Sequence, residues 1–432
     1  MRIFIILKDY NKLINVLSGI FIIILALILL SNFFYLYSSG YNRLAKDKIP
    51  VINGDGASYY SYLPYYLLNW KNIHFERLYS PSDFDPTGNK YNIGEAVLIL
   101  PFFLAAHLIS IMVKYPLDGY SYFYQIFAGL SGLFYGLSGI YFLKKVLERY
   151  FSKSVTLVIL AAIIFGTNLY NYLTSNILYS HSFSFFLFAA LIYYLPIFYA
   201  NSKSIKRGVI LAIIFGLLIL IRLTNILSIL IIVLYGIYNF KDFRDRIILS
   251  LKNYRVLIIF IIIVLLIFIP QLITWKLAFN KWVVYSYGKE GFDFINPFIA
   301  NSLFSLRRGL FFYSPILIFS ILGIWFLKNK VKEFNIAFLI FISLIIFINS
   351  SWFMWWFGSG FGNRSYIEFL PLFALPLASF YSSLKSKKII ISISIISVVL
   401  IIFTLIRMYW YWKGLLPMDE VTLLSYRNVI FK

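Results

Sequence analysis

Apolar runs follow one another along the whole chain, separated by short polar or basic segments. Eleven of them are predicted to cross a membrane as helices, near residues 13–37, 120–143, 154–172, 182–200, 208–221, 225–239, 256–278, 311–328, 335–353, 366–384 and 389–408. A helix rises about 1.5 Å per residue, so a run of about 18 apolar residues or more spans the hydrocarbon layer. The pattern predicts an all-α polytopic membrane protein with about eleven transmembrane helices, in which residues 1–432 form a single integral membrane domain.

The composition agrees with a bilayer as the solvent. Of the 432 residues 61% are hydrophobic, and the mean hydropathy is +0.82, which leaves no room for a large soluble domain. The chain has no cysteine, so disulfide frameworks and thiolate metal sites are excluded. The net charge of +22 comes from short basic clusters between apolar runs. Clusters of this kind are topology signals, so nucleic acid is not a predicted partner.

Six basic clusters determine the predicted orientation. They are Arg2/Lys8/Lys12, Lys144/Lys145/Arg149/Lys153, Lys203/Lys206/Arg207, Lys241/Arg244/Arg246/Lys252/Arg255, Lys328/Lys330/Lys332 and Lys385/Lys387/Lys388. If all are cytoplasmic, the chain crosses the membrane an even number of times between neighbouring clusters. Three apolar runs separate the first two clusters, so the run 95–113, which contains Pro101, is predicted to be a re-entrant or interfacial helix. The N-terminus is then cytoplasmic and the C-terminus external.

This topology makes residues 38–119 the first external loop. The aromatic stretch 58–72 within it is predicted to be an interfacial helix, because Tyr and Trp favour headgroup depth. Just before it stands Gly54-Asp55-Gly56, where glycine on either side lets the backbone approach a ligand closely and leaves the carboxylate open. The alternative is that these residues are merely a turn. We predict Asp55 as a general base that accepts a proton from a hydroxyl group.

Other candidate residues are predicted to face the same side. His181 lies in a short external turn at the start of a span and is the second predicted catalytic residue, although a hydrogen-bonded interfacial histidine is the alternative. Four arginines depart from the positive-inside preference, namely Arg222, Arg307, Arg308 and Arg364. Guanidinium groups bind phosphate oxygens bidentately, so a lipid phosphate is a predicted partner, with an arginine–carboxylate pair as the alternative. Motifs of hydrolases and of zinc sites are absent from the sequence.

Several segments together resemble a known group of enzymes. They are Asp55-Gly56 with Tyr59-Tyr60, residues 91–101, Ser180-His181-Ser182, residues 307–315 and residues 355–371. A first span, an external loop with an aspartate and interfacial helices resemble the GT-C fold of polyprenyl-phosphate-sugar-dependent membrane glycosyltransferases. That group includes the protein O-mannosyltransferases, the aminoarabinose and oligosaccharyl transferases, and mannosyltransferase-like bacterial members.

The resemblance implies an inverting transfer of a sugar from a polyprenyl-phosphate donor to an acceptor hydroxyl of a glycan, lipid or protein. Asp55 is then the catalytic aspartate, and the predicted substrate-binding residues are Tyr59, Tyr60 and Glu95 together with the four arginines. It also implies the external face of a bacterial plasma membrane. Many members carry a second acid after the third span, where this chain has Asn176 and His181. For that reason we predict no cofactor and no required divalent metal.

Two other functions remain open. An O-antigen-ligase or polymerase-like enzyme also uses external arginine and histidine, but usually carries its main external loop late in the chain. A lipid flippase or small-molecule transporter usually shows internal repeats and charges at the bilayer midplane, and the sequence has no convincing repeat.

Overall fold

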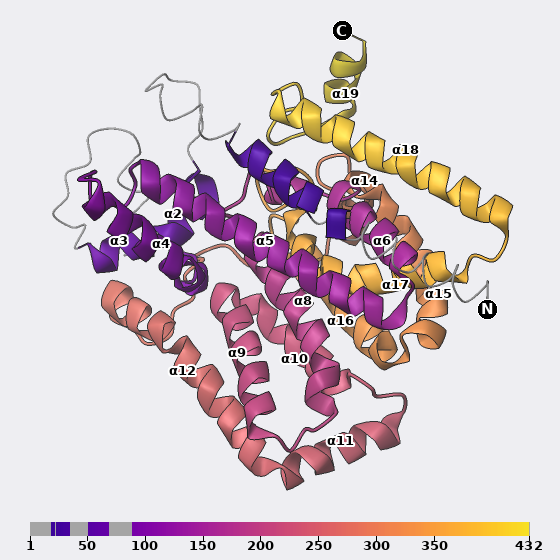
Figure 1. Ribbon diagram of the computed structural model, residues 1–432, viewed down its shortest axis with the longest axis horizontal. Helices are drawn as coiled ribbons and strands as arrows, with labels where there is room; N and C mark the ends of the chain where they lie inside the picture. The colour runs from indigo at the N-terminus through magenta and orange to yellow at the C-terminus, as the bar shows by residue number, and fades with distance from the viewer. Residues whose placement is uncertain (1–18, 22, 35–50, 69–88, 432) are drawn as a thin grey trace, which may run out of the picture.

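A computed structural model of the protein describes residues 19–21, 23–34, 51–68 and 89–431 (Figure 1). The first predicted span, the predicted external loop and the predicted interfacial helix lie partly outside these residues, and the cluster Arg2/Lys8/Lys12 lies wholly outside them. The described α-helices are α2 (Gly54–Tyr60), α3 (Tyr62–Leu67), α4 (Gly94–Met112), α5 (Tyr122–Tyr150), α6 (Lys153–Phe165), α7 (Leu169–Tyr172), α8 (Ser180–Tyr199), α9 (Ile205–Ile221), α10 (Ile229–Leu234), α11 (Phe240–Lys252), α12 (Tyr254–Phe279), α13 (Ile299–Phe304), α14 (Leu310–Tyr313), α15 (Ile318–Lys330), α16 (Asn335–Ser351), α17 (Leu370–Ser383), α18 (Lys387–Trp412) and α19 (Leu423–Ile430). Short 3-10 helices are η3 (Leu223–Ser228), η4 (Pro315–Leu317), η5 (Lys332–Phe334) and η6 (Arg364–Phe369).

The architecture is all-α, as predicted, and six of the described helices are long and apolar enough to cross a membrane. They are Gly94–Met112, Tyr122–Tyr150, Ser180–Tyr199, Tyr254–Phe279, Lys332–Ser351 and Lys387–Trp412. Five of these coincide with predicted spans. The sixth, α4, is the run predicted to be re-entrant or interfacial. It forms one 19-residue helix that continues through Pro101, so its length and composition do not set it apart from the spans.

Several of the other predicted spans are broken helices. The run 154–172 divides into α6 and α7, 311–328 into α14, η4 and α15, and 366–384 into η6 and α17. Buried polar groups join these breaks: the backbone N–H of Asn168 donates to Oγ of Ser314, and its side-chain amide donates to the carbonyls of Phe361 and Asn363. Side-chain partners of this kind satisfy the backbone groups that a broken helix frees.

Four of the five basic clusters that the structure describes gather around the C-terminal end of α8. Arg149 donates to the carbonyl of Tyr193 at 3.3 Å and Arg207 to that of Ile197 at 2.6 Å. Arg246 of α11 lies over the ring of Tyr199, the last residue of α8. The cluster around Lys332 joins the same end, since the N–H of Gly236 donates to the carbonyl of the neighbouring Glu333 at 2.8 Å.

The candidate functional residues lie at the other end of the same helix. His181 and Tyr199 are separated by 18 helical residues, which corresponds to about 27 Å at 1.5 Å per residue. A hydrocarbon layer is about 30 Å thick. The helices α12 and α18 lie on opposite sides of the bundle and bury little of their apolar surface (Figure 1). The bundle therefore has a basic end, an opposite end with the site described below, and apolar flanks.

Candidate functional site

A cavity of about 250 Å³ collects residues that are far apart in the sequence. Its walls come from the start of α2, residues 90–92 before α4, the N-terminal end of α8, the C-terminal end of α9, residues 284–292 after α12, and residues 348–364 at the end of α16 and beyond it. Five predicted site residues line it, namely Asp55, Tyr59, His181, Arg222 and Arg364. The structure thus brings both predicted catalytic residues and two of the four arginines to one cavity.

The Gly54-Asp55-Gly56 segment forms the first turn of α2, and contacts with the segment before α8 explain both glycines. Gly54 has a φ of +51°, and an added Cβ there would lie 2.5 Å from the hydroxyl oxygen of Tyr179. A Cβ on Gly56 would lie 2.6 Å from the carbonyl oxygen of Leu178. Only glycine allows α2 to approach this segment so closely. The close backbone approach places Asp55 at the cavity wall.

The carboxylate of Asp55 forms a salt bridge with Arg364. Its Oδ2 lies 2.8 Å from Nη2 of Arg364, and the guanidinium lies 5.2 Å from the ring centre of Tyr179. Burial raises the pKa of the Tyr179 phenol to about 12, and the negative charge of Asp55 acts in the same direction. Tyr179 therefore stays protonated at neutral pH and presents a neutral phenol beside the ion pair.

The buried carboxylate of Glu368, which does not line the cavity, pairs with two residues that do. Nδ1 of His181 lies 2.8 Å from Oε2 of Glu368, and Nη1 of Arg222 lies 3.1 Å from Oε1 of the same carboxylate. Nη1 of Arg222 is also 3.1 Å from Nδ1 of His181. Guanidinium nitrogens can only donate, so the arrangement is satisfied when Nδ1–H of His181 and Arg222 both donate to Glu368. This tautomer leaves Nε2 of His181 as an acceptor.

Aromatic residues and a third ion pair complete the cavity. Nζ of Lys90 lies 2.7 Å from Oε1 of Glu290 and lies over the rings of Tyr91 and Tyr287. The rings of Tyr59 and Tyr91 have centroids 4.6 Å apart, and Oγ of Ser180 donates to the hydroxyl of Tyr59. Burial raises the pKa of Tyr59 well above its ordinary value, so the wall presents a neutral phenol. Flat aromatic faces beside charged groups suit a ligand with both apolar and polar surfaces.

Four predicted substrate-binding residues do not line the cavity, and two of them, Tyr60 and Glu95, lie in α2 and α4. Tyr60 points to the other side of α2, where its hydroxyl donates to the carbonyl of Gly119 at 2.6 Å and its ring packs on Phe103. Glu95 stands in the first turn of α4 and is fully buried. Neither of its carboxylate oxygens has a hydrogen-bond partner among the described residues.

Arg307 and Arg308 hold the segment that follows α18. Nη2 of Arg307 lies 2.9 Å from Oδ1 of Asp419, and its guanidinium lies 3.7 Å from the ring centre of Trp356. Arg308 is completely buried and donates to the carbonyl of Met418. The alternative of an arginine–carboxylate pair thus describes Arg307, and it also describes Arg222 and Arg364, although these two still line the cavity.

Glu368 and Tyr179 belong to the site, although the sequence predicts a role for neither of them. Glu368 was recognisable as a carboxylate at the start of an apolar run, a position that requires a partner in a membrane protein. That partner is His181, so the segment with Asn176 and His181 does have an acid beside it, contributed by a distant part of the chain. For Tyr179 the sequence holds no comparable signal, because its role depends on contact with Gly54.

Among the residues that the structure describes, no group of three or more His, Asp and Glu side chains is placed to hold a metal ion. A comparison with models of known protein families finds no match, and a search of curated proteins also finds none.

Proposed function

We propose that the cavity is the active site of an inverting glycosyltransferase that uses a polyprenyl-phosphate sugar as donor. The observation that carries the proposal is that one carboxylate, Asp55, and two guanidinium groups, Arg222 and Arg364, line a single cavity with aromatic walls. The chemistry needs a base for the incoming hydroxyl and positive charge for the departing phosphate. Lys90 and Glu290 also line the cavity. Besides His181, its lining therefore holds three cationic side chains and two carboxylates.

In the proposed reaction, Asp55 takes the proton of the acceptor hydroxyl as that oxygen forms a bond to the anomeric carbon of the donor. The bond between this carbon and the phosphate oxygen breaks, and the lipid phosphate leaves with the electron pair. Attack opposite the leaving group inverts the anomeric configuration. Arg364 exchanges part of its contact with Asp55 for a contact with the phosphate. Donor binding therefore weakens the ion pair and frees the carboxylate of Asp55 to accept the proton.

His181 is a second candidate base, because Glu368 orients its imidazole with Nε2 available to accept a proton. An enzyme of the O-antigen-ligase type, with a lipid-pyrophosphate donor, depends on such a histidine. Variants of the two residues separate the two assignments. Loss of transfer in Asp55→Asn with activity retained in His181→Gln favours Asp55, and the opposite result favours His181.

The site is proposed to face the external side of a bacterial plasma membrane. The supporting observation is that four basic clusters gather about 27 Å away along α8, at the opposite end of the bundle. Basic clusters favour the cytoplasmic side.

The experiment uses purified protein in liposomes with a panel of polyprenyl-phosphate sugars. Sugar transfer by the wild type that is lost in Asp55→Asn and kept in Asp245→Asn supports the proposal, since Asp245 is an exposed residue of α11. Undiminished transfer by Asp55→Asn removes Asp55 from its role. Lipid translocation without any sugar transfer favours a flippase.

A further inference from the structure

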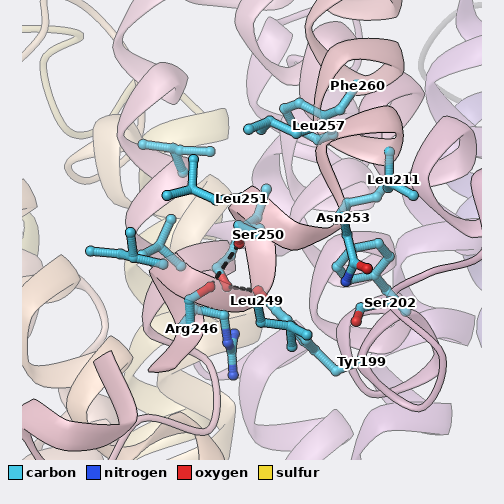
Figure 2. Close-up of a pocket in the computed structure, with 16 residues that line it drawn as sticks. Tyr199, Ser202, Leu211, Arg246, Leu249, Ser250, Leu251, Asn253, Leu257 and Phe260 are labelled. Atoms are coloured by element: carbon cyan, nitrogen blue, oxygen red, sulfur yellow. Dashed lines mark hydrogen bonds between the residues drawn. The ribbon is translucent and has the colours of Figure 1, made fainter. Parts of the chain in front are cut away.

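A second cavity, of about 330 Å³, lies at the basic end of the bundle. The C-terminal end of α8, the helices α9, α10 and α11, and the N-terminal end of α12 line it (Figure 2). Twelve of the sixteen lining residues are aliphatic or aromatic, among them Tyr199, Leu211, Ile232, Leu257 and Phe260. This volume and lining are typical of a pocket for a ligand with a large apolar part.

The helix α11 forms one wall of this pocket and is amphipathic. None of its residues is buried, and Phe240, Ile247 and Leu251 are exposed apolar side chains whose spacing of seven and four residues places them on one face. Its other residues include the basic side chains Lys241 and Lys252. Apolar side chains on one face and lysine or arginine on the other are typical of a helix that lies at the headgroup level of a membrane. The pocket is therefore placed where a lipid has both its phosphate and the first part of its acyl chains.

Arg246 is the charged residue of the pocket. Its Nη2 donates to the carbonyl of Tyr235 at 2.9 Å, and its guanidinium lies 3.9 Å from the ring centre of Tyr199. Its Nη1 is buried and has no hydrogen-bond partner in the part of the chain that the structure describes. A buried donor on a charged group is costly when it is unpaired. An anionic oxygen would complete the site.

We propose that this pocket binds an anionic phospholipid, with an acyl chain between α11 and α12 and the headgroup phosphate accepting from Nη1 of Arg246. Arginine is suited to phosphate because of its planar donors. The surrounding basic residues of α11 add a long-range attraction for anionic lipids. The pocket is independent of the proposed glycosyl transfer, since it lies at the far end of α8 and shares no lining residue with the first cavity.

The test is a titration of the delipidated, detergent-solubilised protein with phosphatidylglycerol or phosphatidylcholine, read by native mass spectrometry. We expect one phosphatidylglycerol per chain, bound about tenfold more tightly than phosphatidylcholine. Both lipids carry a phosphate, but the ammonium of choline repels the guanidinium of Arg246 and leaves phosphatidylcholine without a net charge. Arg246→Gln removes this preference. Arg244→Gln, the matched control, keeps it, because Arg244 is exposed, pairs with Asp245 and does not line the pocket.

A second variant tests the acyl-chain part of the proposal. Ser250→Trp places an indole among the lining residues, and we expect it to weaken binding of both lipids by about tenfold or more because it fills the pocket. Equal lipid preference in Arg246→Gln and Arg244→Gln overturns the assignment of Arg246. Undiminished binding by folded Ser250→Trp, or equal affinity of the wild type for the two lipids, overturns the proposal. If Arg246→Gln does not fold, the Ser250→Trp variant and the wild-type preference decide the result.

Discussion

Removing the charge of Glu368 is expected to destabilise the protein strongly. The side chain of Glu368 is 2% exposed and accepts from His181, which is 4% exposed, and from Arg222, which is 19% exposed. Glu368→Gln keeps the size and one acceptor oxygen but leaves the guanidinium of Arg222 without its counter-ion. Breaking a buried pair in this way costs about 3–5 kcal/mol. Because Arg222 keeps some access to solvent, we expect a value near the lower limit, about 3 kcal/mol.

Glu290→Gln is the matched control. The pair of Lys90 and Glu290 has a similar separation, 2.7 Å, but the two side chains are 37% and 30% exposed. An ion pair in contact with solvent contributes about 0–1 kcal/mol. Thermal unfolding of all variants is measured in the same detergent. We expect the midpoint of Glu368→Gln to fall by on the order of 5 °C, and that of Glu290→Gln by at most about 1 °C.

A double variant tests the physical reason. If the loss comes from an unpaired charge, Arg222→Met added to Glu368→Gln recovers more than half of it, because no buried cation remains. Equal midpoints for Glu368→Gln and Glu290→Gln would refute the reasoning. So would a double variant that is less stable than Glu368→Gln alone, since the loss would then not come from the charge of Arg222.

Three further predictions concern the site and the end of the chain. Gly56→Ala is expected to lower both stability and activity, because the added Cβ meets the carbonyl of Leu178. Gly291→Ala, with no atom within 4 Å of the added Cβ, should leave both unchanged. If the two variants change the thermal midpoint and the transfer rate equally, the prediction is contradicted. Arg364→Lys is expected to raise the KM for the lipid donor by about tenfold, since lysine keeps the charge but loses the bidentate geometry; an unchanged KM would remove Arg364 from donor binding. Burial raises the pKa of Asp419, but the N–H of Glu420 and the guanidinium of Arg307 outweigh burial and hold the pKa below its ordinary value of 3.8. The stabilisation by the pair of Asp419 and Arg307 is therefore complete above pH 3.8 and is lost as the pH falls through the lower pKa of the folded state. Between about pH 5 and pH 2, the thermal midpoint of the wild type should fall further than that of Asp419→Asn.

The helical framework was predictable because apolar length is a property of local sequence. The sequence predicts the ends of α8, α12, α16 and α18 within four residues, whereas α5 continues seven residues beyond the predicted end at residue 143. The broken helices were not predicted, because a hydropathy average passes over the one or two polar residues at each break. Asn168 illustrates this, since its hydrogen-bond partners Ser314 and Asn363 come from distant parts of the chain. The GT-C architecture and the count of eleven spans remain predictions.

The sequence predicts those parts of the candidate site that glycine residues or unusually placed charges mark. The glycines at 54 and 56 predict a close approach of the backbone to a ligand, whereas the structure shows them close to Tyr179 and Leu178 of the same chain. The arginines were recognised by their position outside the expected basic clusters. Their pairing was not predictable, since Arg364 lies beside Asp55 and Arg307 beside Asp419 only through tertiary packing.

The central claim is that Asp55 removes a proton in a sugar transfer carried out in the first cavity. Its most direct test is the rate of transfer by Asp55→Asn at saturating polyprenyl-phosphate sugar and acceptor. General-base catalysis contributes about 10²- to 10⁴-fold, so the kcat of Asp55→Asn should fall at least 100-fold while Asp245→Asn matches the wild type. A kcat for Asp55→Asn within about threefold of the wild type would contradict the account, because a base worth 10²-fold or more cannot be removed at so small a cost.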